Sequence, residues 1–205
     1  IEALSGGAVW LLTETEGAIR IDTNPEDYSL TSQWYSAQSG QFSATRVFGV
    51  YEDLLGNEWI LSDNGLGMLT AGQTTPTSYF VDAAEREKKG GQAFYSCLEY
   101  NSEIYFGSDN GRVWCYQKEN GQFQLQNLPA SSRIVSINSV EGNELIFTTA
   151  KDGFFSYQPK TKAIEHFPAS RFPNASIHSV YVDKASEVWF EQHIPGTVVH
   201  FNPRT

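Results

Sequence analysis

Short apolar segments alternate with turn-forming residues along the whole chain. The clearest example is Val50 to Leu69, VYEDLLGNEWILSDNGLGML, in which three apolar, β-favouring segments are separated by two turns. Gly56-Asn57 and Asn64-Gly65 adopt positive φ at low steric cost, and an Asn-Gly step is a strong hairpin signal. The stretch therefore predicts three antiparallel strands joined by tight turns, a β-meander.

The same pattern occurs five times when the large residue after the first turn is used as an anchor. The anchors are Trp10, Trp59, Tyr105, Ile146 and Trp189, and a glycine of the second turn follows each one. Successive anchors lie 49, 46, 41 and 43 residues apart, close to the roughly 40 to 50 residues of one four-stranded propeller blade. The sequence thus predicts an all-β fold, a β-propeller of about five blades, with the aromatic anchors packed between blades.

The predicted blades cover approximately residues 1–31, 46–81, 93–126, 134–167 and 177–205. The first begins abruptly, and the last has no segment for an outer strand. Closed propellers contain about four to eight blades and hide their edges by joining the first to the last. We therefore expect residues 1–205 to be one propeller fragment of a larger propeller. The charged crossover 82–91 is also compatible with a helical turn over 83–89.

Composition supports one all-β array with many turns, since 14% of the residues are aromatic and 17 are glycine. No apolar run reaches the roughly 18 residues that suggest a membrane span, so we expect no membrane contact by this fragment. The formal net charge is −10, and the one basic cluster, Arg86 to Lys89, is short and interrupted by Glu87. This charge balance excludes nucleic acid as an expected partner.

The two cysteines fit neither a disulfide scaffold nor a zinc site, because the four histidines show no ligand spacing beside them. Cys97 falls on the first predicted strand of its blade and Cys115 on the third, so their backbones should be roughly 10 Å apart. A disulfide needs Cα atoms within roughly 7 Å. The turn at Asp53 lacks the alternating oxygen donors of an EF-hand and is better explained by turn capping. We expect two free thiols, no metal and no cofactor.

The second copy resembles the two-component regulator propeller repeat, usually of the form V..I.ED..G.IWIGT..GGL..Y. Glu52-Asp53, Gly56-Asn57, Trp59-Ile60 and Gly65-Leu66 match it directly, and Tyr157 to Lys160 with Ile164 to Pro168 match its continuation. The other copies are degenerate. The resemblance implies a periplasmic, non-catalytic sensor module of a Bacteroides-type hybrid two-component histidine kinase. It also implies an oligosaccharide ligand, the rest of the receptor chain as a partner, and a homodimer as an open alternative.

Two other functions stay open. Propellers also host lyases and glycoside hydrolases, and a glycosidase needs two carboxylates about 5 to 9.5 Å apart. The 24 acidic residues include no distinctive pair, and no nucleophile elbow, metalloprotease helix or phosphate-binding loop occurs. His193 and His200 would suit a lyase, but His200 alternates with apolar residues in a predicted strand and is better explained as structural. A protein-interaction scaffold is the third alternative.

The path of a four-stranded meander predicts where a ligand would bind. The turn between strands two and three shares a face with the crossover to the next blade, so the crossovers 32–45 and 168–175 crowd the face of turns 62–65 and 191–196. Long loops on a rigid scaffold carry recognition, and sugars suit flat aromatic surfaces bordered by hydrogen-bonding groups. We predict Trp34, Tyr35, Arg171 and His193 as ligand-binding residues. The alternative for Trp34 and Tyr35 is that they cover the gap between two blades.

Overall fold

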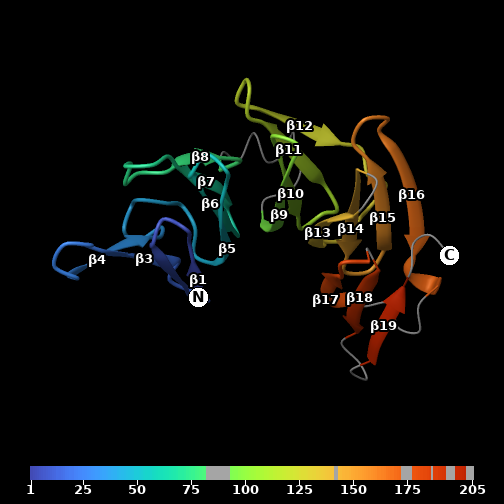
Figure 1. Cartoon of the computed structure of the whole chain (residues 1–205), viewed down its shortest axis with the longest axis horizontal. Helices are drawn as coiled ribbons and strands as arrows, with labels where there is room; N and C mark the ends of the chain where they lie inside the picture. The colour runs from blue at the N-terminus through green and yellow to red at the C-terminus, as the bar shows by residue number, and fades with distance from the viewer. Residues whose placement is uncertain (82–92, 141–142, 172–176, 186, 193–196, 202–205) are drawn as a thin grey trace. The chain divides into compact units, whose positions relative to one another are not determined.

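The chain forms antiparallel sheets throughout. The structure, a computed structural model, describes residues 1–81, 93–140, 143–171, 177–185, 187–192 and 197–201. In these residues, five sheets are each built from strands that follow one another in the chain, and the one helical element is a short 3-10 turn (Figure 1). The all-β prediction is therefore confirmed.

The strand bounds follow the turn residues closely. The first sheet contains β1 (Glu2–Ala3), β2 (Val9–Leu12), β3 (Ala18–Thr23) and β4 (Leu30–Tyr35), and the second contains β5 (Val47–Glu52), β6 (Glu58–Ser62), β7 (Gly65–Leu69) and β8 (Thr77–Tyr79). The third contains β9 (Phe94–Tyr100), β10 (Glu103–Ser108), β11 (Val113–Gln117) and β12 (Gln122–Gln126). The fourth contains β13 (Ile134–Val140), β14 (Glu144–Thr149), β15 (Gly153–Gln158) and β16 (Ala163–Pro168), after which η1 (Ala169–Arg171) begins the crossover. The described part of the fifth contains β17 (Ile177–Val182), β18 (Val188–Gln192) and β19 (Thr197–Phe201). The proposed helical turn over 83–89 lies outside the described residues.

The chain divides into two compact units, Ile1–Phe94 and Tyr95–Thr205. The division falls at the start of β9, between the second and third sheets. That residues 1–205 form one propeller fragment stays a prediction.

In the first unit, the core lies between the first two sheets and is centred on an anchor. Trp10 is fully buried, and its ring centroid lies 4.9 Å from that of Tyr35. Its indole Nε1 donates to Oε2 of Glu58 at 2.7 Å, and Nη2 of Arg20 bonds Oε1 of the same carboxylate at 2.8 Å. The anchor of the first sheet is thus hydrogen-bonded to β6 of the second.

In the second unit, β14 supplies side chains to two cores. Leu145 and Phe147 pack with Tyr105 and its neighbours in the third sheet, whereas Ile146 packs with Val188 and Phe190 of the fifth. Consecutive side chains of a strand point to opposite faces of the sheet. The middle of the fourth sheet is therefore apolar on both sides, which explains the continuous apolar run in its sequence.

The anchors behave alike in the first four sheets. Trp10, Trp59 and Tyr105 are fully buried, and Ile146 is 2% exposed. Trp189 differs, because 38% of it is exposed; its indole stacks on His200 with ring centroids 4.3 Å apart. In the part of the chain that the structure describes, no further sheet follows β19, so the packing of Trp189 between blades stays a prediction.

A buried carboxylate connects the first turn of the second sheet to its anchor. Asp53 is 4% exposed. It accepts hydrogen bonds from the main-chain nitrogens of Leu55 at 2.9 Å and Asn57 at 3.0 Å, and from Nε1 of Trp59 at 3.1 Å. The predicted turn-capping role of Asp53 is confirmed, and the same carboxylate also fixes the indole.

The fifth sheet repeats this arrangement. Asp183 accepts from the main-chain nitrogens of Ala185 at 2.8 Å and Glu187 at 3.0 Å, and from Nε1 of Trp189 at 2.9 Å. The spacing of six residues from aspartate to tryptophan is identical in both copies. We call this arrangement the Asp–Trp clasp.

The second turn requires a glycine because its main chain lies very close to the main chain at the end of the fourth strand. Gly153 has φ +93°, and a Cβ added there would lie 2.1 Å from the carbonyl oxygen of Phe167 at the end of β16. Gly65 has φ +97°, and its Cβ would lie 2.3 Å from the carbonyl oxygen of Tyr79 at the end of β8. In both sheets, the second turn therefore packs directly on the end of the fourth strand, where any side chain would collide with the main chain.

Replacing Asp53 tests the clasp. Asp53→Ala should lower the free energy of unfolding in urea by about 1 to 3 kcal/mol, because the buried indole and amide donors lose their acceptor. Asp27→Ala is a matched control, since that exposed carboxylate caps a turn through the main-chain nitrogen of Ser29 at 2.9 Å. We expect a much smaller loss for Asp27→Ala, and equal losses would contradict the role of the clasp.

The stabilisation by Asp53 should also depend on pH. Burial, the largest influence, raises the pKa of Asp53, but the hydrogen bonds from Asn57, Trp59 and Leu55 outweigh it and hold the pKa below its usual value. The contribution is then fully present above the unfolded pKa of about 3.9 and is lost as pH falls through the lower folded pKa. The stability difference between wild type and Asp53→Ala should shrink below about pH 4.

Two glycine variants separate backbone strain from collision. Both Gly153 and Gly56 have positive φ, +93° and +77°, but a Cβ on Gly56 meets nothing within 4 Å. Gly153→Ala should therefore unfold at a melting temperature at least about 4 °C lower than Gly56→Ala, if the collision alone costs about 2 kcal/mol. Equal melting temperatures would show that the approach to Phe167 is not tight.

Candidate functional site

One face of the sheets is fixed by carboxylates that bind the incoming crossover. Asp152, in the turn between β14 and β15, accepts from the main-chain nitrogens of Ser131-Ser132 at 2.8 and 2.7 Å, and from both serine hydroxyls at 3.0 and 2.8 Å. Asp63, in the equivalent turn of the second sheet, accepts from the main-chain nitrogens of Thr45-Arg46 at 3.1 and 3.2 Å. Second turns and crossovers therefore share one face in these two sheets, as the meander path predicts.

On this face of the second unit, a pocket opens between the third and fourth sheets. Its volume is about 590 Å³, within the roughly 300 to 1,000 Å³ of small-molecule sites. We call it the crossover pocket. It is lined by Tyr95, Asp109, Ser131, Ser132, Arg133, Ala150, Lys151 and Asp152. Because these residues come from β9, two second turns and the crossover into β13, the blade architecture itself forms the pocket.

One wall of the crossover pocket is a stacked aromatic and cationic pair. The guanidinium carbon of Arg133 lies 4.9 Å from the ring centroid of Tyr95. Arg133 is exposed and immediately precedes β13, and its carbonyl oxygen accepts from the main-chain nitrogen of Ala150 at 2.9 Å. The cation–π contact and the fixed main chain hold the guanidinium against the ring. The pair presents a flat surface and several N–H donors to the pocket.

The carboxylate of Asp152 has a structural task in this pocket. Burial, the largest influence, raises its pKa, but the hydrogen bonds from Ser131 and Ser132 outweigh it and hold the pKa below its usual value. Asp152 is therefore ionised at neutral pH. It positions the crossover and is unsuited to donating a proton.

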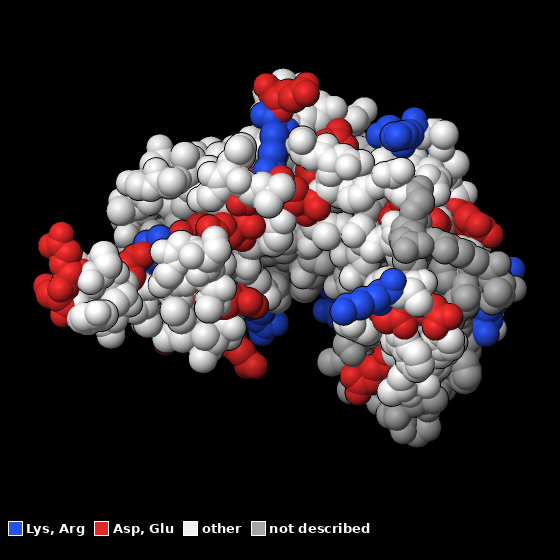
Figure 2. Space-filling model, viewed as in Figure 1, with Lys and Arg blue, Asp and Glu red and all other residues white. Residues whose placement is uncertain are grey.

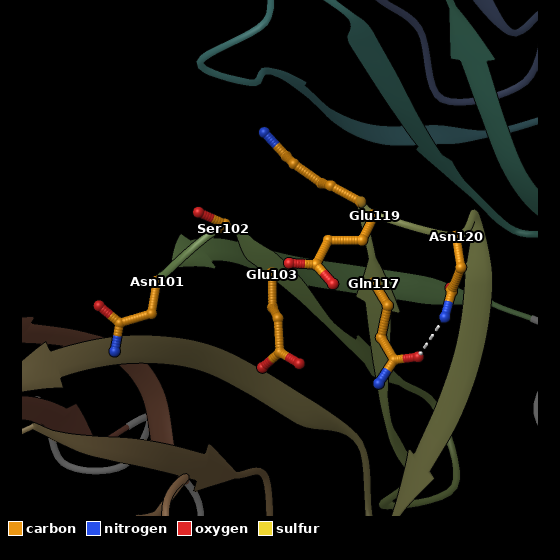
Figure 3. Close-up of a pocket in the computed structure, with 7 residues that line it drawn as sticks. Asn101, Ser102, Glu103, Gln117, Glu119 and Asn120 are labelled. Atoms are coloured by element: carbon orange, nitrogen blue, oxygen red, sulfur yellow. Dashed lines mark hydrogen bonds between the residues drawn. The ribbon is translucent and has the colours of Figure 1, made fainter.

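A second pocket lies at the opposite end of the third sheet, beside the first and third turns (Figure 3). Its volume is about 200 Å³, and it is lined by Asn101, Ser102, Glu103, Gln117, Lys118, Glu119 and Asn120. Nδ2 of Asn120 donates to Oε1 of Gln117 at 3.1 Å, and the side chains of Glu103 and Gln117 point in the same direction (Figure 3). This pocket has no aromatic wall and is below the usual size of a ligand site, so the crossover pocket is the better candidate.

Behind the small pocket lies a buried polar cluster that contains one of the two cysteines. Tyr105 donates its hydroxyl to Oε2 of Glu103 at 2.8 Å. Burial, with the neighbouring Glu103 carboxylate, raises the pKa of Cys115 to about 12. Cys97 lies on β9 and Cys115 on β11, with β10 between them, and neither cysteine is in a disulfide. The prediction that they are not joined is confirmed.

Two of the predicted ligand-binding residues lie in a strand. Trp34 and Tyr35 end β4, whereas the sequence placed them in the following crossover. Alternation along the strand leaves Trp34 40% exposed and Tyr35 1% exposed. The expectation that Tyr35 is accessible to a ligand is therefore wrong; it packs on Trp10 between two sheets, as the alternative interpretation held. Burial raises the pKa of Tyr35 to about 12.

Of the other two predicted site residues, Arg171 does not line the crossover pocket. Arg171 ends η1, with its guanidinium carbon 5.7 Å from the ring centroid of Phe167. His193 lies outside the described residues. His200 has its Nε2 2.7 Å from Oε2 of Glu187, which is consistent with the structural role expected for it.

Sequence reasoning missed Tyr95 and Arg133. A signal for them is the arginine directly before an innermost strand, which occurs twice, as Arg46 before β5 and Arg133 before β13. Arg46 also lies over an aromatic ring, with its guanidinium carbon 6.0 Å from the ring centroid of Phe48. Arg133 and Tyr95 come from different blades, so their contact is seen only in the folded structure.

The visible surface carries acidic side chains in several separate places, with isolated basic side chains between them (Figure 2). Among the described residues, no group of three or more His, Cys, Asp and Glu side chains is placed to hold a metal ion. Within the same residues, no helix has the length and apolar character needed to cross a membrane.

Comparison with solved structures identifies the fold. The extracellular domain of BT4673 from B. thetaiotaomicron superposes with a TM-score of 0.76 and 18% identity, over 99% of this chain and 29% of that chain. The extracellular domain of the hybrid two component system BT3049 from the same organism gives 0.71 and 14%, over 96% and 26%. The WD40 β-propeller domain of Doa1 gives 0.66 and 10%, over 98% and 62%.

The five sheets are propeller blades. The predicted β-propeller is confirmed by these likenesses, and the chain spans under a third of the length of the two Bacteroides structures that it matches. No protein-family model matches the sequence, and no curated protein matches it. The degenerate repeats explain why the fold is clearer in three dimensions than in the sequence.

The cysteine environment leads to a direct chemical test. Denatured, unreduced protein should titrate two thiols with a thiol-specific reagent. In the native protein, Cys115 should react far more slowly than Cys97, because it is fully buried with a pKa of about 12, whereas Cys97 is partly exposed. A Cys97→Ser variant isolates the buried thiol, and rapid native labelling of that variant would contradict the described packing.

Proposed function

We propose that this chain is the ligand-binding propeller of a periplasmic sensor region, part of a bacterial hybrid two-component receptor, and that its ligand is an oligosaccharide. The crossover pocket is the observation that carries this proposal. The resemblance of the repeat supports the receptor assignment, as does the likeness to the two Bacteroides structures, which are extracellular domains. In this proposal the chain itself is not an enzyme, and signalling depends on the rest of the receptor chain, with or without a homodimer.

The chemistry of the pocket suits a saccharide. Tyr95 offers an aromatic surface against which the C–H face of a sugar packs, and Arg133 and Lys151 border it with N–H donors. The pocket rests on turns and strand ends whose main chains are tied together by Asp152. A site held in this way changes little on binding, so the protein itself loses little conformational entropy when a ligand binds.

A propeller glycosidase is the main alternative, and the pocket does not favour it. A glycosidase needs a carboxylic acid whose pKa is raised so that it protonates the leaving group. Asp152 has a lowered pKa and its carboxylate accepts four hydrogen bonds. A protein-interaction scaffold is the alternative that is favoured if no glycan binds in the test below.

Trp34 and Arg171 remain proposed ligand contacts on other parts of the surface. Trp34 is 40% exposed on β4, and Arg171 is exposed at the crossover that follows β16. They belong to different units of the chain, so each is tested separately from the crossover pocket.

A glycan array followed by calorimetry tests the proposal. The 205-residue chain should bind at least one oligosaccharide class, and Tyr95→Ala should weaken that binding about tenfold or more through loss of the aromatic wall. Trp34→Ala is the matched aromatic control and identifies the alternative site if it alone weakens binding. Melting temperatures of both variants exclude unfolding as the cause. If no glycan on the array binds, the oligosaccharide proposal is wrong.

A further inference from the structure

Two cations of the crossover pocket, Arg133 and Lys151, have no counter-ion among the described residues. In the part of the chain that the structure describes, Arg133 and Lys151 form no ion pair within 4 Å, whereas Arg20 bonds Glu58 and Lys118 bonds Glu99. Both unpaired side chains are exposed and line the same pocket. The chain has a net charge of −10 and 24 acidic residues, and the pocket that these two cations line also contains the carboxylates of Asp109 and Asp152.

The nearest carboxylate in sequence does not neutralise them. Asp152 follows Lys151 directly, but its oxygens accept four hydrogen bonds from Ser131 and Ser132. Those N–H and O–H dipoles stabilise its charge locally. The carboxylate is therefore committed to the turn and crossover, and the N–H donors of Arg133 and Lys151 stay available to the pocket.

Arg46 occupies the equivalent position in the second blade, but its guanidinium is hydrogen-bonded within the protein. It also precedes an innermost strand, but its Nε donates to the carbonyl oxygen of Glu14 at 3.0 Å. Among the described residues, no main-chain acceptor is bonded to the guanidinium of Arg133, whose carbon lies over the ring of Tyr95, 4.9 Å from its centroid. A guanidinium with free N–H donors binds a carboxylate or sulfate through two parallel hydrogen bonds.

We propose that the crossover pocket selects saccharides that carry an anionic group, a uronate carboxylate or a sulfate ester, which Arg133 and Lys151 bind while the sugar ring packs beside Tyr95. This inference rests on the proposed function and specifies its ligand class. Since the two cations are exposed, the attraction should be screened by salt and should fall as ionic strength rises.

Matched sugar pairs test the charge requirement. A galacturonate oligosaccharide is compared with its methyl-esterified, neutral counterpart, and a sulfated disaccharide with its desulfated counterpart, by calorimetry on the 205-residue chain. We expect the charged member of at least one pair to bind at least about tenfold more tightly, since a charge-assisted hydrogen bond is lost in the neutral one. Which pair responds distinguishes a carboxylate ligand from a sulfate ligand.

Variants then locate the effect. Arg133→Gln and Lys151→Gln should each reduce binding of the charged member about tenfold or more and flatten its salt dependence. Lys160→Gln makes the same charge change at the exposed turn between β15 and β16, at the opposite end of the sheet, and should leave binding unchanged. Unchanged melting temperatures confirm that each variant is folded.

The outcomes separate this inference from the proposed function. Equal binding of charged and neutral members, or undiminished binding by Arg133→Gln, would overturn the anion requirement and leave an oligosaccharide-binding module in place. If Arg133→Gln, Lys151→Gln and Lys160→Gln weaken binding of the charged sugar equally, the effect comes from the net charge of the protein. That result would also overturn the anion requirement of the pocket. If neither pair binds and only neutral glycans on the array bind, the anionic ligand class is wrong. If no glycan on the array binds, the proposed function fails as well.

Discussion

The period-two alternation of side chains is the constraint on which this architecture depends. A middle strand such as β14 packs Leu145 and Phe147 against one neighbouring sheet and Ile146 against the other. A shift of one residue in its pairing would exchange both sets and spoil two cores at once. Register is therefore strongly determined in the central strands, and the exposed turns are free to vary around a fixed frame.

That frame explains why the candidate site lies where turns meet crossovers. A second turn must carry a glycine that fits against the end of strand four, and in two blades it carries an aspartate that binds the incoming crossover. In the fourth blade, these structural residues lie beside Arg133, whose guanidinium contacts Tyr95 of the third. Side chains that the frame presents on this face can change without loss of the fold.

The sequence was informative wherever a feature recurs and has a local cause. Turn glycines and apolar segments predicted the repeated antiparallel strands, and the capping role of Asp53 followed from the turn-forming residues around it. The end of β4 was missed because Gln33, Trp34 and Tyr35 lie in a polar context of Ser, Gln and Gly. Tyr35 is buried by contacts with Trp10, which lies 25 residues away, and no local pattern encodes that contact. Tyr95 and Arg133 come together from separate blades, so their pairing had no signature along the chain.

The hydrogen bond from Trp10 to Glu58 has a consequence for the order in which the protein matures. The indole N–H of the first blade is buried, and its acceptor belongs to β6, 48 residues further along the chain. A nascent chain that has emerged only as far as β4 contains a complete first sheet but lacks both this acceptor and the residues of the second sheet that cover Trp10, so the indole stays hydrated. The first blade therefore finishes folding only when the second one arrives, because the burial of Trp10 and its hydrogen bond are completed together.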